Sequence, residues 1–213
     1  MVEAQQNPVT HVFNIMRRMP PNQVAKSIAG INRIIQDEDI KQEIIEKVDQ
    51  PLEIEEDTSN GKPFLKHEYN RDGNSYRSPW SNQYFPANAE CTFMPSAELL
   101  SLEQRANDLF AQYVYLYYNN ASSSVYFVDI EGEGFNAAFL VKKELNNEKM
   151  IKYGAWDSIN IVTCEKKGAE CNYRVITTVL ITVDSSSDKL GNFSINGSSS
   201  KSRDLKVTLN LKQ

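Results

Sequence analysis

The chain has few of the residues on which catalysis usually depends. Its 213 residues include only two histidines, His11 and His67, and three cysteines, Cys91, Cys164 and Cys171. The cysteine spacing matches no zinc or redox motif, and we find no P-loop, nucleophile elbow, HExxH or dinucleotide-binding fingerprint. Neither histidine lies near a nucleophile or near another metal-ligating residue in a known motif. General acid–base catalysis and metal binding are therefore not favoured. We therefore expect no enzyme, no cofactor and no metal site.

Long apolar runs and clusters of one charge are also missing. No stretch reaches the roughly 20 apolar residues that span a bilayer, so we expect no transmembrane segment. The first ten residues, MVEAQQNPVT, lack the apolar centre of a secretory signal. The net charge is −5 and no run of Lys and Arg stands out, so nucleic acid is not an expected partner. An odd number of cysteines argues against a disulfide framework and favours reduced thiols in the cytoplasm.

One acidic segment, DIEGEG at residues 129–134, resembles a calcium loop only in part. The twelfth position of such a loop holds a glutamate with two coordinating oxygens, and here it is Leu140. Glu131 and Glu133 would both be solvated at a hairpin tip, which gives no separated acid–base pair. An acidic turn between two strands is the favoured interpretation.

The first 50 residues carry apolar side chains at helical spacing in three short segments. Asn7, Asn22, and either Asp37 or Asp39 stand where helix N-caps are expected. Prolines at 20, 21 and 51 end the first and third segments. Short helices joined by tight connections favour an antiparallel bundle.

Strand signals and an aromatic loop follow. Leu52–Glu56 and Phe64–Glu68 are predicted strands on either side of an Asn60-Gly61 turn. The segment Tyr69–Pro95 has no clear period but holds six aromatic residues. We expect it to be packed against the domain, because long free loops are unusual and aromatic side chains are more stable when they are buried.

From Ser96 onward the sequence predicts one long helix and then a sheet. Ser96 is a predicted N-cap, and the apolar face expected to pack on the sheet consists of Leu99, Leu102, Ala106, Leu109, Phe110, Tyr113, Leu116 and Tyr117. Apolar alternation then predicts strands at Val125–Ile130, Phe135–Lys143, Lys149–Thr163, Asn172–Val183, Asn192–Ile195 and Leu205–Leu211. The serine run Ser185–Ser187 is predicted to be a loop.

The predicted fold class is α+β. We expect a three-helix stalk at residues 1–50, a small globule of short strands and aromatic loop at 51–95, one long helix at 96–119, and an antiparallel β-meander at 120–213. One helix covers at most one face of such a sheet, and the meander has two edges that need protection or pairing. The fold therefore looks incomplete as a monomer.

Six segments resemble, in order, the beta subunit family of the actin-filament capping protein. They are MRRMPP at 16–21, VDQPL at 48–52, YNRDGNSYRSPWSN at 69–82, MPSAEL at 94–99, SSVYF at 123–127 and AWDSI at 155–159. The resemblance implies a mushroom-shaped heterodimer in which the meander continues into the sheet of a structurally similar alpha subunit. It also implies binding to the barbed ends of actin filaments, which blocks subunit exchange, and a place in the cytoplasmic actin cytoskeleton.

The resemblance carries one departure and one alternative. Family members continue into a long helix and a C-terminal tentacle, whereas this sequence ends at Gln213, so we expect either a chain truncated before them or an unusual member of the family. The alternative function is a regulatory or scaffold subunit that binds a partner without strong capping. A small hydrolase built on the meander is a third interpretation, which the scarcity of histidine disfavours.

The resemblance also implies a site for regulatory peptides with basic motifs. Its residues here are Arg18, Asp49, Glu68 and Tyr84, where carboxylates accept hydrogen bonds from peptide Arg or Lys and the tyrosine offers a flat face. Alternatively, Arg18 and Asp49 pair with each other and only hold the stalk together.

The segments that resemble the family contain further candidate residues. Each of them stabilises the fold, binds a partner, or does both. Ion pairs among the charged ones would hold the aromatic loop, and the two tryptophans are predicted to be buried packing residues. These residues are Arg71, Asp72, Arg77, Trp80 and Trp156.

Overall fold

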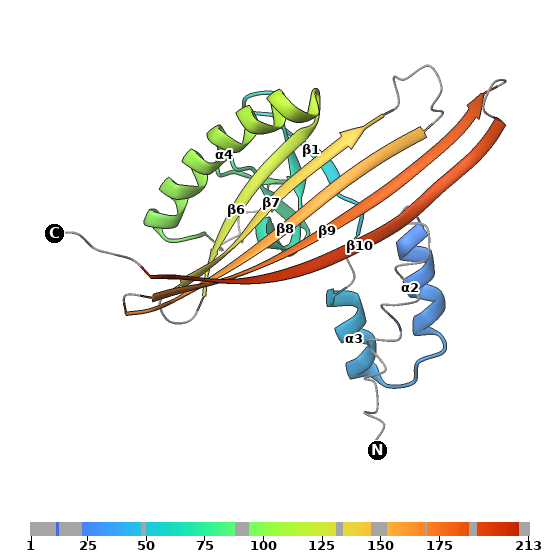
Figure 1. The fold of residues 1–213 in the computed structure, drawn as a ribbon, viewed down its shortest axis with the longest axis horizontal. Coiled ribbons are helices and arrows are strands. Elements are labelled where there is room, and N and C mark those ends of the chain that lie inside the picture. Colours follow the sequence, from blue (N-terminus) through green and yellow to red (C-terminus); the bar gives the residue numbers. More distant parts are fainter. Residues whose placement is uncertain are drawn as a thin grey trace. The chain divides into compact units, whose positions relative to one another are not determined.

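Helices and antiparallel sheets occupy separate stretches of the chain, which confirms the predicted α+β class (Figure 1). The computed structural model describes residues 12, 23–47, 50–87, 94–130, 134–145, 153–168, 170–187 and 191–208. The chain divides into two units. One comprises Met1–Pro51, Leu145–Trp156 and Val179–Ser199, and the other comprises Leu52–Glu144, Asp157–Thr178 and Ser200–Gln213.

The first unit contains helices α2 (Val24–Asn32) and α3 (Glu38–Lys47). Asp37 caps α3, because its carboxylate accepts hydrogen bonds from the backbone N–H groups of Asp39 at 3.0 Å and Ile40 at 3.1 Å. This confirms one of the two caps that the sequence left open. The first predicted helix and the expected cap Asn22 lie outside the described residues, apart from position 12, which is helical.

The second unit begins with a hairpin of β1 (Glu53–Asp57) and β2 (Lys62–Lys66). The predicted turn is confirmed: Gly61 has φ +68°, which favours glycine, and its N–H bonds to the carbonyl of Asp57 at 2.8 Å. The aromatic loop then folds into a short 3-10 helix, η2 (Glu68–Asn70), and a small sheet of β3 (Arg71–Asp72), β4 (Ser75–Arg77) and β5 (Tyr84–Phe85).

Helix α4 (Ala97–Tyr118) follows and lies along the sheet at β6 and β7 (Figure 1). Its bounds match the prediction, and Ser96 occupies the N-cap position. The Ser96 side chain makes no capping hydrogen bond, however; its backbone N–H instead donates to the carboxylate of Asp129 at 2.7 Å.

The main sheet is a five-stranded meander with strand order β10-β9-β8-β7-β6. Its antiparallel pairing between β6 and β7 runs from Ser122 opposite Lys142 to Asp129 opposite Phe135. The strands are β6 (Ser122–Asp129), β7 (Gly134–Glu144), β8 (Tyr153–Lys167), β9 (Glu170–Ser187) and β10 (Gly191–Thr208).

Two strand predictions were wrong. The serine run at 185–187 belongs to β9, and β10 is one continuous strand where two separate strands were expected. Both segments are rich in serine and charged residues, which resemble a loop in sequence. Backbone hydrogen bonds to the neighbouring strand nevertheless hold a polar segment extended when little of it faces a core.

The core of the second unit forms between α4 and the sheet. Val125, Phe127 and Ala137 are buried there, with Leu99 and Phe110 of α4 packed against them. The rings of Phe110 and Phe139 meet edge to face at 5.4 Å between centroids. Among the described residues, no helix is long and apolar enough to cross a membrane.

Candidate functional site

Helix α4 turns polar side chains, rather than its leucines, towards the outer edge of β6. The side-chain amide of Asn107 donates to the carbonyl of Val125 and accepts from its N–H, both at 2.8 Å. One carboxylate oxygen of Glu103 accepts the N–H of Phe127 at 2.7 Å. These bonds replace those of a neighbouring strand, so this edge of the sheet is closed by a helix.

The same carboxylate holds the aromatic loop. Arg77 on β4 reaches Glu103 with two N–H groups, at 2.7 and 2.9 Å, and both side chains are almost completely buried. A third bond joins Arg77 to the amide oxygen of Asn82 at 2.9 Å. Arg77 thus holds this loop by an ion pair, which is the structural one of its two expected roles, and its partner is on α4 rather than within the loop.

Two buried side chains anchor the rest of this loop to the first hairpin. Asn70 accepts the N–H of His67 at 2.8 Å and donates to the carbonyl of Arg77 at 2.8 Å. Asp57 accepts the hydroxyl of Ser78 at 2.6 Å. Burial alone would raise the pKa of Asp57, but hydrogen bonds from Ser59, Ser78 and Ser81 hold it well below its usual value. The expectation that this loop is packed down is confirmed for residues 69–87, the greater part of the loop that the structure describes.

The four candidate peptide-binding residues are only partly described. Arg18 and Asp49 lie outside the described residues. Glu68 stands on η2 with an exposed carboxylate that pairs with Arg71 at 2.9 Å. Tyr84 lies on β5 with only 9% of its surface exposed. Glu68 therefore offers a surface anion, while most of the Tyr84 surface is already packed.

The remaining signature residues divide between surface and interior. Arg71 is exposed beside Glu68, and Asp72 is half-buried opposite Ser75. Trp80 and Trp156, which were expected to be buried packing residues, are half-buried. The indole N–H of Trp80 donates to the carbonyl of Pro63 at 3.0 Å, which draws the ring to the edge of the hairpin rather than into the core.

The other edge strand of the sheet, β10, differs from β6. In its part within the second unit, the side chains at residues 201–207 are all exposed. On its inner side it bonds to β9, with Arg174 paired to Asp204 at 2.8 Å and Thr178 bonded to Ser200 at 2.6 Å. Its other side has no partner strand among the described residues. A strand of this length is a template for pairing with another chain.

An apolar row remains on the outer face of α4, which corrects the predicted helix face. Of the residues expected to pack on the sheet, five are exposed to between 38% and 75%: Leu102, Leu109, Tyr113, Leu116 and Tyr117. Glu103, Asn107 and Val114 are buried instead. The reason is that the β6 edge needs hydrogen-bonding groups, which only the polar side of α4 supplies.

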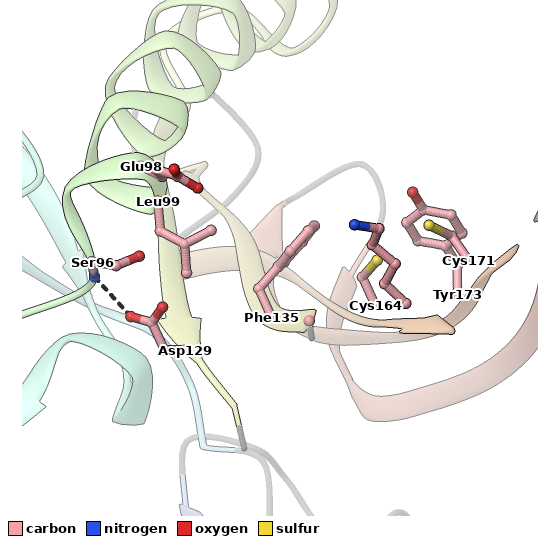
Figure 2. Close-up of a pocket in the computed structure, with 10 residues that line it drawn as sticks. Ser96, Glu98, Leu99, Asp129, Phe135, Cys164, Cys171 and Tyr173 are labelled. Carbon is pink, nitrogen blue, oxygen red and sulfur yellow. Dashed lines mark hydrogen bonds between the residues drawn. The ribbon is translucent and has the colours of Figure 1, made fainter. Parts of the chain in front are cut away.

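A cavity of about 360 Å³ lies beside the start of α4, at the end of the sheet. Cys164 of β8 and Cys171 and Tyr173 of β9 line it together with Phe135, as Figure 2 shows. Gly134 closes against β8 so tightly that a Cβ would stand 2.2 Å from the carbonyl oxygen of Cys164. Glu131 and Glu133 of the acidic turn lie outside the described residues.

Sequence reasoning missed the edge-closing pair and the grouping of the thiols. Glu103 and Asn107 are four residues apart on one helix face, but polar residues at that spacing usually indicate a solvated surface. The signal for the cysteines was their position on either side of Gly168, a predictable hairpin turn. They were instead expected only to be reduced thiols without a redox motif.

Comparisons with known proteins agree on one family. A model of the family described as "F-actin capping protein, beta subunit" matches residues 9–213. Proteins named F-actin-capping protein subunit beta are similar to this chain: that of Drosophila melanogaster is 40% identical over 87% of this chain and 66% of its own length. That of Arabidopsis thaliana is 36% identical over 87% and 74%, and that of Dictyostelium discoideum 34% over 93% and 72%.

The chain spans about two thirds of the Drosophila relative's length and somewhat more of the other two. A solved structure, of the homodimeric actin capping protein alpha subunit from Plasmodium berghei, aligns with a TM-score of 0.49 and 17% identity, over 96% of this chain and 82% of that one. Since the family model covers nearly the whole sequence and the relatives are up to 40% identical, the chain belongs to the F-actin capping protein beta subunit family.

Proposed function

We propose that this chain is the beta subunit of a heterodimer that binds the barbed ends of actin filaments and blocks subunit exchange there. Family membership supports this function, because the relatives are named for F-actin capping. The proposal places the chain in the cytoplasm, at the actin cytoskeleton, and assigns it a binding role without catalysis.

The single structural observation that carries the pairing with an alpha subunit is the difference between the two sheet edges. Glu103 and Asn107 bond the N–H and carbonyl of Val125 and the N–H of Phe127 on β6, while the outer side of β10 has no partner strand in the part of the chain that the structure describes. A partner that adds a strand therefore has one edge to use. The alpha subunit pairs there, so that one sheet continues through both subunits.

Two neighbouring proline substitutions test the pairing. N–H groups of successive strand residues point to opposite sides, so of Ser202→Pro and Arg203→Pro one removes an inner bond to β9 and the other an outer donor. We expect the variant that loses the outer donor to keep its own melting temperature but to lose the alpha subunit in size-exclusion chromatography. If both variants bind alpha as well as the parent chain does, β10 is not the pairing edge.

Filament assays test the function itself. We expect the chain together with an alpha subunit to stop barbed-end growth of pyrene-labelled actin, and the chain alone to do so weakly or not at all. Filaments already blocked at their barbed ends are the control, and their growth at the pointed end should not change. Uninhibited barbed-end growth with a complex that chromatography shows to be intact would contradict the capping role and favour a scaffold role.

A further inference from the structure

Two thiols that the proposed function does not use lie side by side in the cavity at the end of the sheet. Cys164 and Cys171 are each 4% exposed, and neither is in a disulfide. They come from adjacent antiparallel strands joined through the turn at Gly168. In Figure 2 both sulfur atoms lie on the same side of the β8–β9 hairpin, against Tyr173.

The side chains of Cys164, Cys171 and Tyr173 line the same cavity and lie close together in Figure 2. Burial raises the pKa of Cys164, whereas a hydrogen bond from Tyr173 acts in the opposite direction because it favours the thiolate. The hydrogen bond to Cys164 raises the pKa of Tyr173 to about 12, so its hydroxyl stays protonated and available as a donor.

The cavity gives small molecules access to these sulfur atoms. Its volume of about 360 Å³ holds several water molecules and its wall includes both polar and apolar groups. Lys166 also lines it and offers a positive charge beside the thiols. A compound as small as hydrogen peroxide fits in this volume.

We propose that Cys164 and Cys171 are a redox-active pair that closes to an intramolecular disulfide when hydrogen peroxide enters this cavity. One thiolate attacks a peroxide oxygen: an S–O bond forms, the O–O bond breaks, and the departing hydroxide takes a proton to become water. The second thiol then attacks the resulting sulfenic acid. The S–S bond forms, the S–O bond breaks, and a second water leaves with the remaining proton.

The reaction removes two electrons from the two sulfur atoms and reduces one peroxide to two waters. Its product fastens the end of β8 to the start of β9 across the Gly168 turn. The inference is independent of actin binding, because it concerns the thiols alone, and its test does not depend on capping.

Peptide mapping of the full chain provides the test. Trypsin cuts after Lys152, Lys166, Lys167 and Arg174, so the two cysteines fall in different peptides, Tyr153–Lys166 and Gly168–Arg174. After a short treatment with equimolar hydrogen peroxide, we expect the mass of the intact chain to be lower by about 2 Da. The remaining thiols are then blocked and the chain is digested. The two peptides should then run as one cross-linked species that dithiothreitol separates.

The third cysteine provides a matched control. Cys91→Ser should form the same cross-link, while Cys164→Val and Cys171→Ala, two changes that keep the site apolar, should lose it with unchanged melts. The cross-link in the unmutated chain is read directly, so the test does not depend on whether a variant folds. Unlinked peptides after peroxide, separate sulfinic acids on both thiols, or a cross-link through Cys91 would each overturn the proposal.

Discussion

Arg77 and Glu103, 26 residues apart, meet in a buried two-pronged ion pair with N···O distances of 2.7 and 2.9 Å. The carboxylate also accepts the backbone N–H of Phe127. One side chain of α4 therefore fixes the aromatic loop and closes the sheet edge together. Its loss should affect both.

Glu103→Ala should be strongly destabilising. It leaves the guanidinium of Arg77 buried without its counter-charge, which typically costs about 3–5 kcal/mol in the free energy of unfolding. Urea unfolding followed by circular dichroism measures the change. The matched control is Glu68→Ala, which removes an exposed ion pair with Arg71 and should cost no more than about 1 kcal/mol. Equal losses for the two variants would mean that the buried pair is not a stabilising junction.

Asn107→Leu should open the β6 edge. The variant keeps an apolar side chain of similar size but leaves the N–H and carbonyl of Val125 without their partner, at about 1–3 kcal/mol for each buried group. An uncovered edge also promotes pairing between chains. We expect a lower melting temperature and concentration-dependent association in analytical ultracentrifugation. Gln112→Leu, an exposed position on the same helix, is the control and should leave both measurements unchanged.

His67 should make stability depend on pH. Its ring nitrogen accepts the N–H of Tyr69 at 3.3 Å, and burial lowers the pKa of His67 to about 4. The unfolded chain has a pKa near 6.5, so it binds the proton first as the pH falls. The stabilising contribution is complete above pH 6.5 and is lost between about 6.5 and 4, at no more than about 1.4 kcal/mol per pH unit.

Melting temperatures measured across this pH range test the assignment. His67→Asn keeps a hydrogen-bond acceptor but cannot be protonated, and should flatten the profile. His11→Asn, at the other histidine, should leave it unchanged. If His11→Asn flattens the profile and His67→Asn does not, the pH dependence comes from His11 and the prediction is wrong.

Glu68 is the testable member of the proposed peptide site. We expect Glu68→Gln to weaken the binding of a basic regulatory peptide in calorimetry, because it removes an exposed anion. Arg71→Ala should strengthen or preserve binding, since it frees this carboxylate from its present ion pair. Asp49→Ala should weaken binding as well. The melting temperature of Tyr84→Ala must be measured together with its affinity, because a side chain that is only 9% exposed also stabilises the fold. Unchanged affinity for both acidic-residue variants would place the site elsewhere.

Local sequence signals predicted which elements form, because each depends on nearby residues. The Asn60-Gly61 turn, the cap at Asp37 and the extent of α4 follow from propensities and spacing within a few positions. The strand of polar residues at β10 does not, since its extended form depends on bonds to β9 rather than on its own composition.

The orientation of α4 could not be predicted from its periodicity. The apolar row Leu102, Leu109 and Leu116 is a sound helical pattern, and the usual rule turns such a row towards the core. The rule failed because the surface opposite α4 includes a strand edge with free N–H and carbonyl groups. Glu103 and Asn107 satisfy that edge, and nothing within the helix sequence states where the edge lies.

The closed edge at β6 also bears on stoichiometry. A subunit with two open edges could add neighbours on both sides and grow into a fibre, whereas in the part of this chain that the structure describes β10 is open and α4 lies along β6. When β10 pairs with an equally one-sided partner, both outer borders of the joint sheet are already occupied by helices. The joint sheet then contains two subunits and no more. The side-chain amide of Asn107 thus limits the size of the assembly without contacting the partner.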